Sequence, residues 1–470
     1  MVGIQRDDLD PIAIVDEQGD PPLLVYNARE SNGGPLYDPD AIILLRADDI
    51  VKGKKGSKKS GGGTPSTLKP GVPIEPLVVR ANAGDCIEFK LTNKLPDTAS
   101  GRLPESPGYA TLPPIVDDFN TNDVAAGNRI GIQPQLVAMQ VLKNASNAGF
   151  NKKADGVPKP GKRKTYIWYA GDIRYDDAES KWKEMPIEFG AINLMPTDPI
   201  KHVSKGAIGA LIIEPRGATW VEDADSRASA TVSPGDPLDS DNAQFEPFRE
   251  FVLMFQNFVN LRFGSDTTLP TAPEEDGTGP ATATFYAGDT VPNLDEAEDP
   301  EDSGQKAFNY RTEPLWFRGG WAPDAPLGFT KDQDMAEILS NGDALTGIGD
   351  PQTPVFIAEA GMPVRLRVLH PGGNQRNNVF TLHGHAWQQE PYTYEGVDEA
   401  RVGSTRLGDN PTSMQEGARM GVGPSNHFDA LLVNGAGGKG AVTGDYLYRD
   451  MSSFQFDGGL WGIFRVTEPE

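Results

Sequence analysis

A chain of 470 residues and 50.6 kDa is too long for one ordinary hydrophobic core, so its length predicts two or three domains. Its 53 glycines and 40 prolines favour short strands joined by turns and exclude a bundle of long helices. The 43 Lys and Arg residues against 67 Asp and Glu residues give a net charge of -24, which repels nucleic acid and anionic membrane surfaces. We therefore expect no nucleic-acid partner, and no stretch is apolar enough to predict a membrane span.

The single cysteine, Cys86, excludes an intrachain disulfide and a cysteine-based zinc or iron–sulfur site. Cys86 falls on an expected strand, where we predict a small buried side chain. The first eleven residues lack the basic and apolar regions of a secretion signal, so the sequence leaves the compartment unknown.

The N-terminal extension has strand composition in residues 23–30 and 41–50, and we expect these strands to join the first domain. Two basic segments, residues 52–64 and 151–164, are predicted to be solvated loops because the rest of the chain is acidic. The acidic run at residues 295–302 is likewise predicted to be a loop. A weak site for a divalent cation is the less favoured alternative there.

An internal repeat organises the rest of the chain. PLVVRANAGDCIEFKLTN (residues 76–93) matches PVFIAEAGMPVRLRVLHP (residues 354–371), each reading as a strand, an Ala-Gly turn and a second strand. Alternation in the first copy sets Cys86, Glu88 and Lys90 on one face and the intervening apolar residues on the other. Each half then ends with a strand, a glycine-rich corner and a closing strand.

This pattern predicts an all-β protein of two tandem Greek-key β-sandwiches. We place the N-terminal extension and the first domain in residues 1–220 and the second domain in residues 245–470. The polar residues 221–244 show no hydrophobic period and are predicted to be the linker.

Several motifs together resemble one family. They are ANAGDCIEFKLTNKLP, KGAIGALIIEP, REFVLMFQN, NYRTEPLW, VFTLHGHAW and GDYLYRDMSSFQFDGGLWGIFRV. The chain resembles the cupredoxin domains of multicopper oxidases, particularly large bacterial copper-oxidase-like and manganese-oxidase-like members, over most of residues 76–466. The resemblance implies two cupredoxin-like sandwiches. In the family, electrons pass from a substrate at a type 1 copper to a trinuclear copper cluster that reduces dioxygen to water.

The copper ligands that the resemblance implies are largely replaced. Copper in these centres takes imidazoles, with a thiolate added at type 1. The family's motif HPxHxHGH registers on this chain so that Asn378 and Thr381 stand where histidines are expected, whereas His383 is kept. The terminal motif, HCHxxxHxxxxM, registers so that His, Cys, His and His are replaced, in that order, by Arg449, Asp450, Met451 and Gln455. The first domain lacks the family's HxH pairs.

Two histidines remain as metal candidates. His383 and His385 are two residues apart, so on a strand they share a face. The resemblance brings Asp450 and Met451 toward His383, and His383, His385, Asp450 and Met451 are therefore the candidate metal ligands. The competing interpretation makes His383 a remnant and His385 a hydrogen-bonded structural residue.

Three further histidines are predicted to have no metal role. We expect His370 at the surface, beside a Pro-Gly-Gly turn, and His427 at the entrance to a strand, where it caps or packs. His202 has no neighbour that singles it out.

The favoured hypothesis is a multicopper-oxidase relative with no bound cofactor, kept as a non-catalytic scaffold or assembly subunit. The alternative is a copper-dependent oxidase, or a subunit of one, whose residual or shared copper site lies around His383 and His385. A third hypothesis is a binding module in a surface layer or filament. The expected partner is a second copy of the chain or a second copper-oxidase-like chain, and the resemblance suggests an extracellular or periplasmic location.

Overall fold

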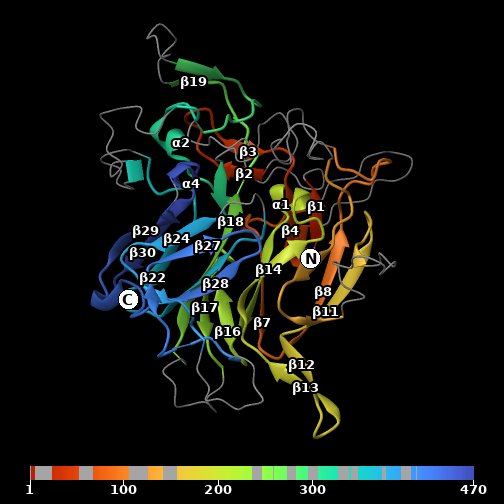
Figure 1. Cartoon of the computed structure of the whole chain (residues 1–470). Helices are drawn as coiled ribbons and strands as arrows, with labels where there is room; N and C mark the ends of the chain where they lie inside the picture. The colour runs from red at the N-terminus through yellow and green to blue at the C-terminus, as the bar shows by residue number, and fades with distance from the viewer. Residues whose placement is uncertain are drawn as a thin grey trace.

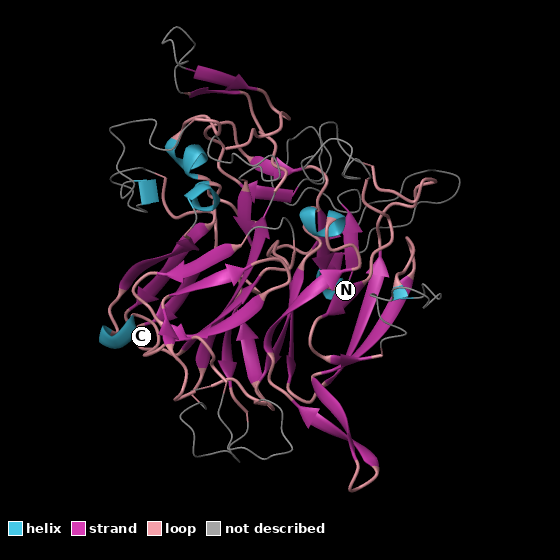
Figure 2. Cartoon of the chain, viewed as in Figure 1, coloured by secondary structure: helices cyan, strands magenta, loops and turns pink. Residues whose placement is uncertain are grey.

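Strands are the main regular secondary structure of the protein. The computed structural model describes residues 2–5, 24–51, 67–104, 125–140, 156–235, 246–257, 259–271, 282–294, 305–325, 338–339, 348–372, 377–392, 404–408, 410–451 and 453–469. Within these ranges the helices are short and include α1 (Lys201–Ser204), α2 (Leu315–Gly319) and α4 (Ser453–Asp457) (Figure 2). The predicted all-β fold is confirmed. The predicted loops at 52–64 and 295–302, and residues 151–155 of the predicted loop at 151–164, lie outside the described residues. The end of the loop at 151–164 was wrongly predicted, because Arg163 and Lys164 begin a strand, β11 (Arg163–Tyr169).

The first half of the chain forms a sandwich of two sheets. One sheet has the order β10-β11-β8-β1-β4, and the facing sheet has the order β7-β15-β14-β9. The strands of the first sheet are β1 (Val2–Gln5), β4 (Ile42–Leu45), β8 (Cys86–Asn93), β10 (Ala138–Met139) and β11 (Arg163–Tyr169). Those of the second are β7 (Leu77–Asn82), β9 (Ile132–Pro134), β14 (Gly190–Pro196) and β15 (Gly209–Glu214). Alternate residues such as Phe89, Trp168 and Ile192 fill the space between the sheets.

The second half repeats this arrangement. One sheet has the order β16-β17-β18-β23-β28, with β21 also paired to β18, and the facing sheet has the order β22-β30-β29-β24-β27. The first comprises β16 (Thr219–Glu222), β17 (Ser229–Ser233), β18 (Phe248–Asn257), β21 (Lys306–Phe308), β23 (Val364–Leu369) and β28 (His427–Leu431). The second comprises β22 (Val355–Glu359), β24 (Asn378–Leu382), β27 (Ala418–Val422), β29 (Gly444–Asp450) and β30 (Trp461–Thr467). Phe251, Phe380 and Phe464 lie in the core between them.

The internal repeat is visible in the strand pairing. In the first half β7 pairs in parallel with the closing strand β15, and in the second half β22 pairs in parallel with the closing strand β30. The turn after each opening strand contains a glycine with positive φ, Gly84 at 91° and Gly361 at 81°. A residue with a Cβ is strained in that conformation, which explains the Ala-Gly turn in both copies of the repeat.

The two sandwiches stack, so that the molecule has four layers of sheet (Figure 1). The inner sheets touch where β14 contacts β23 and β28. Val78 and Ala210 from the first half and Val252 and Met254 from the second belong to one buried apolar cluster between them. The halves are therefore joined by a core, rather than by a flexible connection alone.

Strands of the N-terminal extension contact both halves of the chain. As predicted, β4 joins a sheet of the first sandwich, and β1, a strand that was not predicted, lies beside it in the same sheet. By contrast, β2 (Leu24–Asn27) and β3 (Leu36–Asp38) form a hairpin attached to the second half, where Tyr37 bridges Arg262 and the Asn27 amide donates to Thr312 O at 2.8 Å.

The predicted linker is partly wrong. Residues 229–233 form β17, which pairs with β18, so part of the segment expected to be irregular is a sheet strand. Ala230 and Val232 are fully buried there, at spacing two within a polar run, and this short alternation is what the sequence interpretation missed. Residues 236–245 lie outside the described ranges, and the domain boundaries at 220 and 245 remain predictions.

Smaller two-stranded hairpins lie outside the main sheets. They are β5 (Ile50–Val51) with β6 (Thr67–Leu68), β12 (Gly171–Asp176) with β13 (Lys181–Pro186), β19 (Thr267–Pro270) with β20 (Thr282–Phe285), and β25 (Trp387–Gln388) with β26 (Gln415–Glu416). The β12–β13 hairpin projects from the first sandwich (Figure 1). In the part of the chain that the structure describes, every helix is too short or too polar to cross a membrane.

Candidate functional site

A buried polar cluster lies where β24 meets the end of β29 and α4. Asn378, Asp450 and Gln455 are at most 2% exposed. The Gln455 amide, oriented with its nitrogen toward the other two side chains, donates to Asp450 Oδ2, to Asp450 Oδ1 and to Asn378 Oδ1. Val379 N donates to Asp450 Oδ1 at 3.3 Å, and Asn378 Nδ2 donates to Val422 O at 3.0 Å. These three residues, which the sequence comparison put at copper-ligand positions, are hydrogen-bonded to one another through Gln455.

The strand register separates the four candidate metal ligands. Asp450 pairs with Phe380, and both side chains are fully buried in the sandwich. Successive side chains on a strand point to opposite faces. Met451, next to Asp450, is accordingly 44% exposed, and His383 is also exposed. The candidate set of His383, Asp450 and Met451 is thus divided between the inside and the outside of one sheet.

His383, on the outer face of the sheet, accepts a hydrogen bond from an arginine. Arg449 Nε donates to His383 Nε2 at 3.2 Å, and the Arg449 guanidinium lies 4.8 Å from the centre of the Phe456 ring. Partial burial and the Arg449 charge hold the pKa of His383 below its ordinary value. In this geometry the Nε2 lone pair, which would bind a metal ion, accepts a hydrogen bond instead.

His385 is held at both ring nitrogens. Its Nδ1 is 3.0 Å from His383 O, and its Nε2 accepts from Gly437 N at 3.0 Å. These partners require a neutral ring protonated at Nδ1, and burial holds the pKa of His385 below its ordinary value. The arrangement is that of a structural histidine joining two loops.

The remaining histidines also lie in packed surroundings. His370 was predicted at the surface, and this is wrong, because it is fully buried against the ring of Phe255 at a centroid distance of 6.0 Å. Its ring nitrogens have no hydrogen-bond partner among the described residues, and burial lowers its pKa to about 3. His202 is buried, with Nε2 2.7 Å from Gly127 O, and His427 opens β28 as predicted.

Cys86 corrects another expectation. It was predicted to be buried, but it is exposed at the start of β8, on the outward face with Glu88 and Lys90. The predicted alternation of this strand is confirmed, so the face was right and the burial of the thiol was wrong. Cys86 lies on β8 in the first sandwich, whereas the polar cluster lies in the second.

Copper does not fit the polar cluster as it stands. Its donors are amide and carboxylate groups that satisfy one another, whereas type 1 copper takes a thiolate and imidazoles. Among the described residues, no three or more His, Cys, Asp or Glu side chains gather in a way that would hold a metal ion.

A second buried polar group, which the sequence interpretation missed, lies between the two sandwiches. Arg367 on β23 is fully buried and donates to three carboxylates: Nη1 to Asp429 at 2.8 Å, Nε to Glu250 at 2.9 Å and Nη2 to Glu214 at 3.0 Å. Arg80 Nε on β7 donates to Glu250 at 2.8 Å. We call these five residues the interdomain ion cluster. Charged residues inside apolar strands, as in VRLRVL and REFVLMF, were the available signal.

The pKa values of the two glutamates of the interdomain ion cluster are shifted in opposite directions. Burial and the neighbouring Glu250 carboxylate raise the pKa of Glu214 well above its ordinary value. Burial alone would raise the pKa of Glu250 too, but the guanidinium groups of Arg80 and Arg367 hold it below its ordinary value. Glu214 Oε1 is buried and has no hydrogen-bond partner among the described residues. We predict that Glu214 is protonated, which would let it donate to the neighbouring Glu250 carboxylate.

Comparison with known proteins finds only distant similarity. No family model and no curated protein matches the chain. A multicopper oxidase is 12% identical, with a TM-score of 0.39 over 83% of this chain and 78% of that one. A blue copper oxidase from Nitrosomonas europaea is 12% identical, with a TM-score of 0.38 over 84% and 77%. A copper nitrite reductase from the same organism is 12% identical, with a TM-score of 0.38 over 87% and 88%.

Proposed function

We propose that this chain is a cupredoxin-type protein, related to multicopper oxidases, that acts as a non-catalytic scaffold or assembly subunit. The observation that carries the proposal is the cluster of Asn378, Asp450 and Gln455. These side chains use their polar atoms on one another, and the neighbouring Val379 N–H completes the set. A buried site that is already satisfied by hydrogen bonds gains little from a metal ion that must break them. The hydrogen bond from Arg449 to His383 supports the same conclusion, because a permanent cation next to an imidazole opposes metal binding.

A residual copper site is the second candidate function. It is favoured by the exposure of His383, where a further ligand from another chain has access. Rotation of the Arg449 side chain would free His383 Nε2. In this case the chain would be a copper-dependent oxidase, or a subunit of one, with its site around His383 and His385.

The metal content of the full chain separates the two candidates. The protein is purified without added copper, incubated with copper and dialysed, and its copper is measured by plasma mass spectrometry and its spectrum by absorbance. Substoichiometric copper is the expected result. Stoichiometric copper with a blue band would overturn the scaffold proposal. Stoichiometric copper that is lost in His383→Ala and retained in the control His427→Ala would establish the second candidate.

Restoring the family's type 1 copper ligands tests whether these positions correspond to that site. The combined substitutions Asn378→His, Asp450→Cys, Gln455→His and Leu460→Met would restore two imidazoles, a thiolate and a thioether. These are the ligands that give blue-copper sites their colour. We expect the variant to turn blue with copper, and the matched variant carrying Asp450→Ser in place of Asp450→Cys to stay colourless. A colourless quadruple variant with unchanged circular dichroism would refute the equivalence of these positions.

A scaffold requires a partner, which we propose is a second copy of this chain. The β12–β13 hairpin supports this with an exposed apolar face: Trp182 is 69% exposed and Tyr175 48%, with their ring centres 5.4 Å apart. Two isolated strands are marginally stable in water, so a covering surface is favourable. Light scattering after gel filtration is expected to show an oligomer that Trp182→Ala weakens. A second copper-oxidase-like chain as the partner predicts a monomer in that experiment, and an ordered filament supports the surface-layer alternative.

A further inference from the structure

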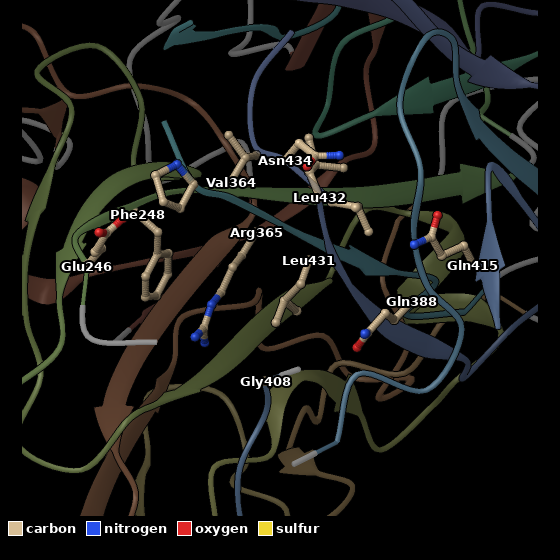
Figure 3. A pocket seen from close by; sticks show the side chains of 12 residues that line it. Glu246, Phe248, Val364, Arg365, Gln388, Gly408, Gln415, Leu431, Leu432 and Asn434 are labelled. Atoms are coloured by element: carbon tan, nitrogen blue, oxygen red, sulfur yellow. The ribbon is translucent and has the colours of Figure 1, made fainter. Parts of the chain in front are cut away.

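A pocket of about 370 Å³ opens beside the inner sheet of the second sandwich. Its walls come from the first residues of β18 and β23, the end of β28, the β25–β26 hairpin and two loops (Figure 3). The lining residues are Glu246, Phe248, Pro363, Val364, Arg365, Gln388, Gly408, Gln415, Leu431, Leu432, Val433 and Asn434. None of them belongs to the polar cluster around Asp450 or to the interdomain ion cluster. A pocket of this size accommodates a small molecule.

Arg365 is the cationic side chain among the lining residues of this pocket. It is 6% exposed, and its guanidinium lies over the ring of Phe248, with Cζ 4.0 Å from the ring centre. Nη1 donates to Glu188 Oε1 at 2.7 Å. Across the described residues, Nε and Nη2 have no hydrogen-bond partner. The Phe248 ring on one side and Glu188 at Nη1 therefore fix the guanidinium in position.

The two unused donors of Arg365 lie on one edge of the planar guanidinium. Nε–H and Nη2–H point in nearly the same direction, which matches the spacing of two carboxylate oxygens. Figure 3 shows the Arg365 side chain between Phe248 and Leu431, with Gln388 and Gln415 on the far side of Leu431. The pocket thus combines a fixed two-donor edge with an apolar wall.

The amides of the pocket differ in availability. Gln388 Nε2 donates to Asn410 O at 3.1 Å, and its Oε1 accepts from Asn410 N at 2.8 Å, so both ends of this amide are used. Gln415 and Asn434 are the other lining amides, and both residues are at least partly exposed. These two amides can bond to polar groups on the rest of a bound molecule.

We propose that this pocket binds a small organic carboxylate, with both carboxylate oxygens on the Nε–Nη2 edge of Arg365. Glu188 already balances much of the Arg365 charge, so binding depends on the geometry of two hydrogen bonds more than on net attraction. Glu246, which lines the same pocket, repels a second negative charge. The ligand class is therefore a monocarboxylate with a neutral or cationic tail. This inference is independent of the proposed scaffold function.

Four matched four-carbon probes test the proposal: butyrate, γ-aminobutyrate, succinate and butyramide. Binding to the full chain is measured by isothermal titration calorimetry and by saturation-transfer NMR. We expect butyrate and γ-aminobutyrate to bind, succinate to bind several-fold more weakly, and butyramide not to bind. Equal binding of butyrate and butyramide, or binding of none of the four probes, would overturn the proposal.

Substitutions locate the binding in the pocket. Arg365→Lys keeps a cation near Glu188 but removes the two-donor edge, and we expect butyrate affinity to fall about tenfold or more, the effect of losing one charge-assisted hydrogen bond. The matched control Arg174→Lys changes a surface arginine on β12 and should leave affinity unchanged.

A second variant keeps the test decisive if Arg365→Lys folds poorly. Asn434 has φ 65°, a conformation that glycine adopts without strain, so Asn434→Gly removes the amide and preserves the backbone. It should weaken γ-aminobutyrate binding several-fold. Unchanged affinity in both Arg365→Lys and Asn434→Gly would place the binding elsewhere and refute the proposal.

Discussion

Two conservative substitutions in the interdomain ion cluster should have very different effects. Glu214 and Glu250 are both fully buried glutamates hydrogen-bonded to Arg367. Glu250 accepts from Arg80 Nε and Arg367 Nε and has a lowered pKa, whereas Glu214 has a strongly raised pKa, so we predict that Glu214 keeps its proton at neutral pH and that Glu250 does not. A glutamine resembles a protonated glutamate but not a carboxylate. Glu214→Gln is therefore a near-substitute for the group present, and Glu250→Gln is not.

The magnitudes follow from the bonds lost. Glu250→Gln weakens two charge-assisted hydrogen bonds and leaves guanidinium charge unbalanced, which costs about 3–5 kcal/mol of unfolding free energy. Glu214→Gln retains an oxygen that accepts from Arg367 and an N–H that donates to Glu250, so we expect a change within about 1 kcal/mol. Urea denaturation at pH 7, followed by tryptophan fluorescence, measures both.

The pH dependence gives a second readout. Because folding raises the pKa of Glu214, the folded chain binds a proton that the unfolded chain releases. Stability from this group is complete below the ordinary glutamate pKa and falls as pH rises through the raised value. The Glu214→Gln variant should lack this decline. Equal losses in the two variants at pH 7, or an unchanged pH profile in Glu214→Gln, would refute the assignment of charges.

Asp450→Ala should lower the free energy of unfolding by about 2–4 kcal/mol, because the buried Gln455 amide loses its acceptor. The exposed control Asp445→Ala should lower it by under about 1 kcal/mol. Equal losses of the two variants in urea denaturation would contradict the role of the polar cluster. Burial, with a smaller effect of the Lys306 charge, lowers the pKa of His370 to about 3 in the folded chain, against an ordinary value of 6.5. The wild-type chain should therefore lose roughly 3–5 kcal/mol of unfolding free energy as pH falls from the ordinary pKa through the folded one. His370→Phe should flatten this acid loss in pH-dependent denaturation, and an unchanged slope would assign the loss to other groups.

The strands were predicted more accurately from the sequence than the polar residues that are buried between the sheets. Period-two alternation and the Ala-Gly turns located β7, β8, β22 and β23 because a half-buried strand leaves its signature in consecutive residues. His370 was misplaced because its burial comes from Phe255, more than a hundred residues away. The same holds for the interdomain ion cluster, in which strands from both halves bring carboxylates to Arg367 and Arg80.

The two segments that carry the candidate site are neighbours in one sheet. The expected proximity of the terminal motif to Thr381 agrees with the register, in which Thr381 on β24 pairs with Arg449 on β29. The strand alternation that sends Asp450 inward and Met451 outward was available from the sequence but was not applied to the metal candidates. The bond between Arg449 and His383 depends on side-chain conformation, which no pattern of residue types encodes.

Because Cys86 is exposed on the outer face of β8, its thiol is a site for chemical labelling in the unmodified protein. Its thiol is the only one in the sequence, so a maleimide spin label reacts at a single known point without any engineered cysteine. Pulsed dipolar spectroscopy on the labelled chain would then return the spacing between neighbouring copies, which a monomer does not produce.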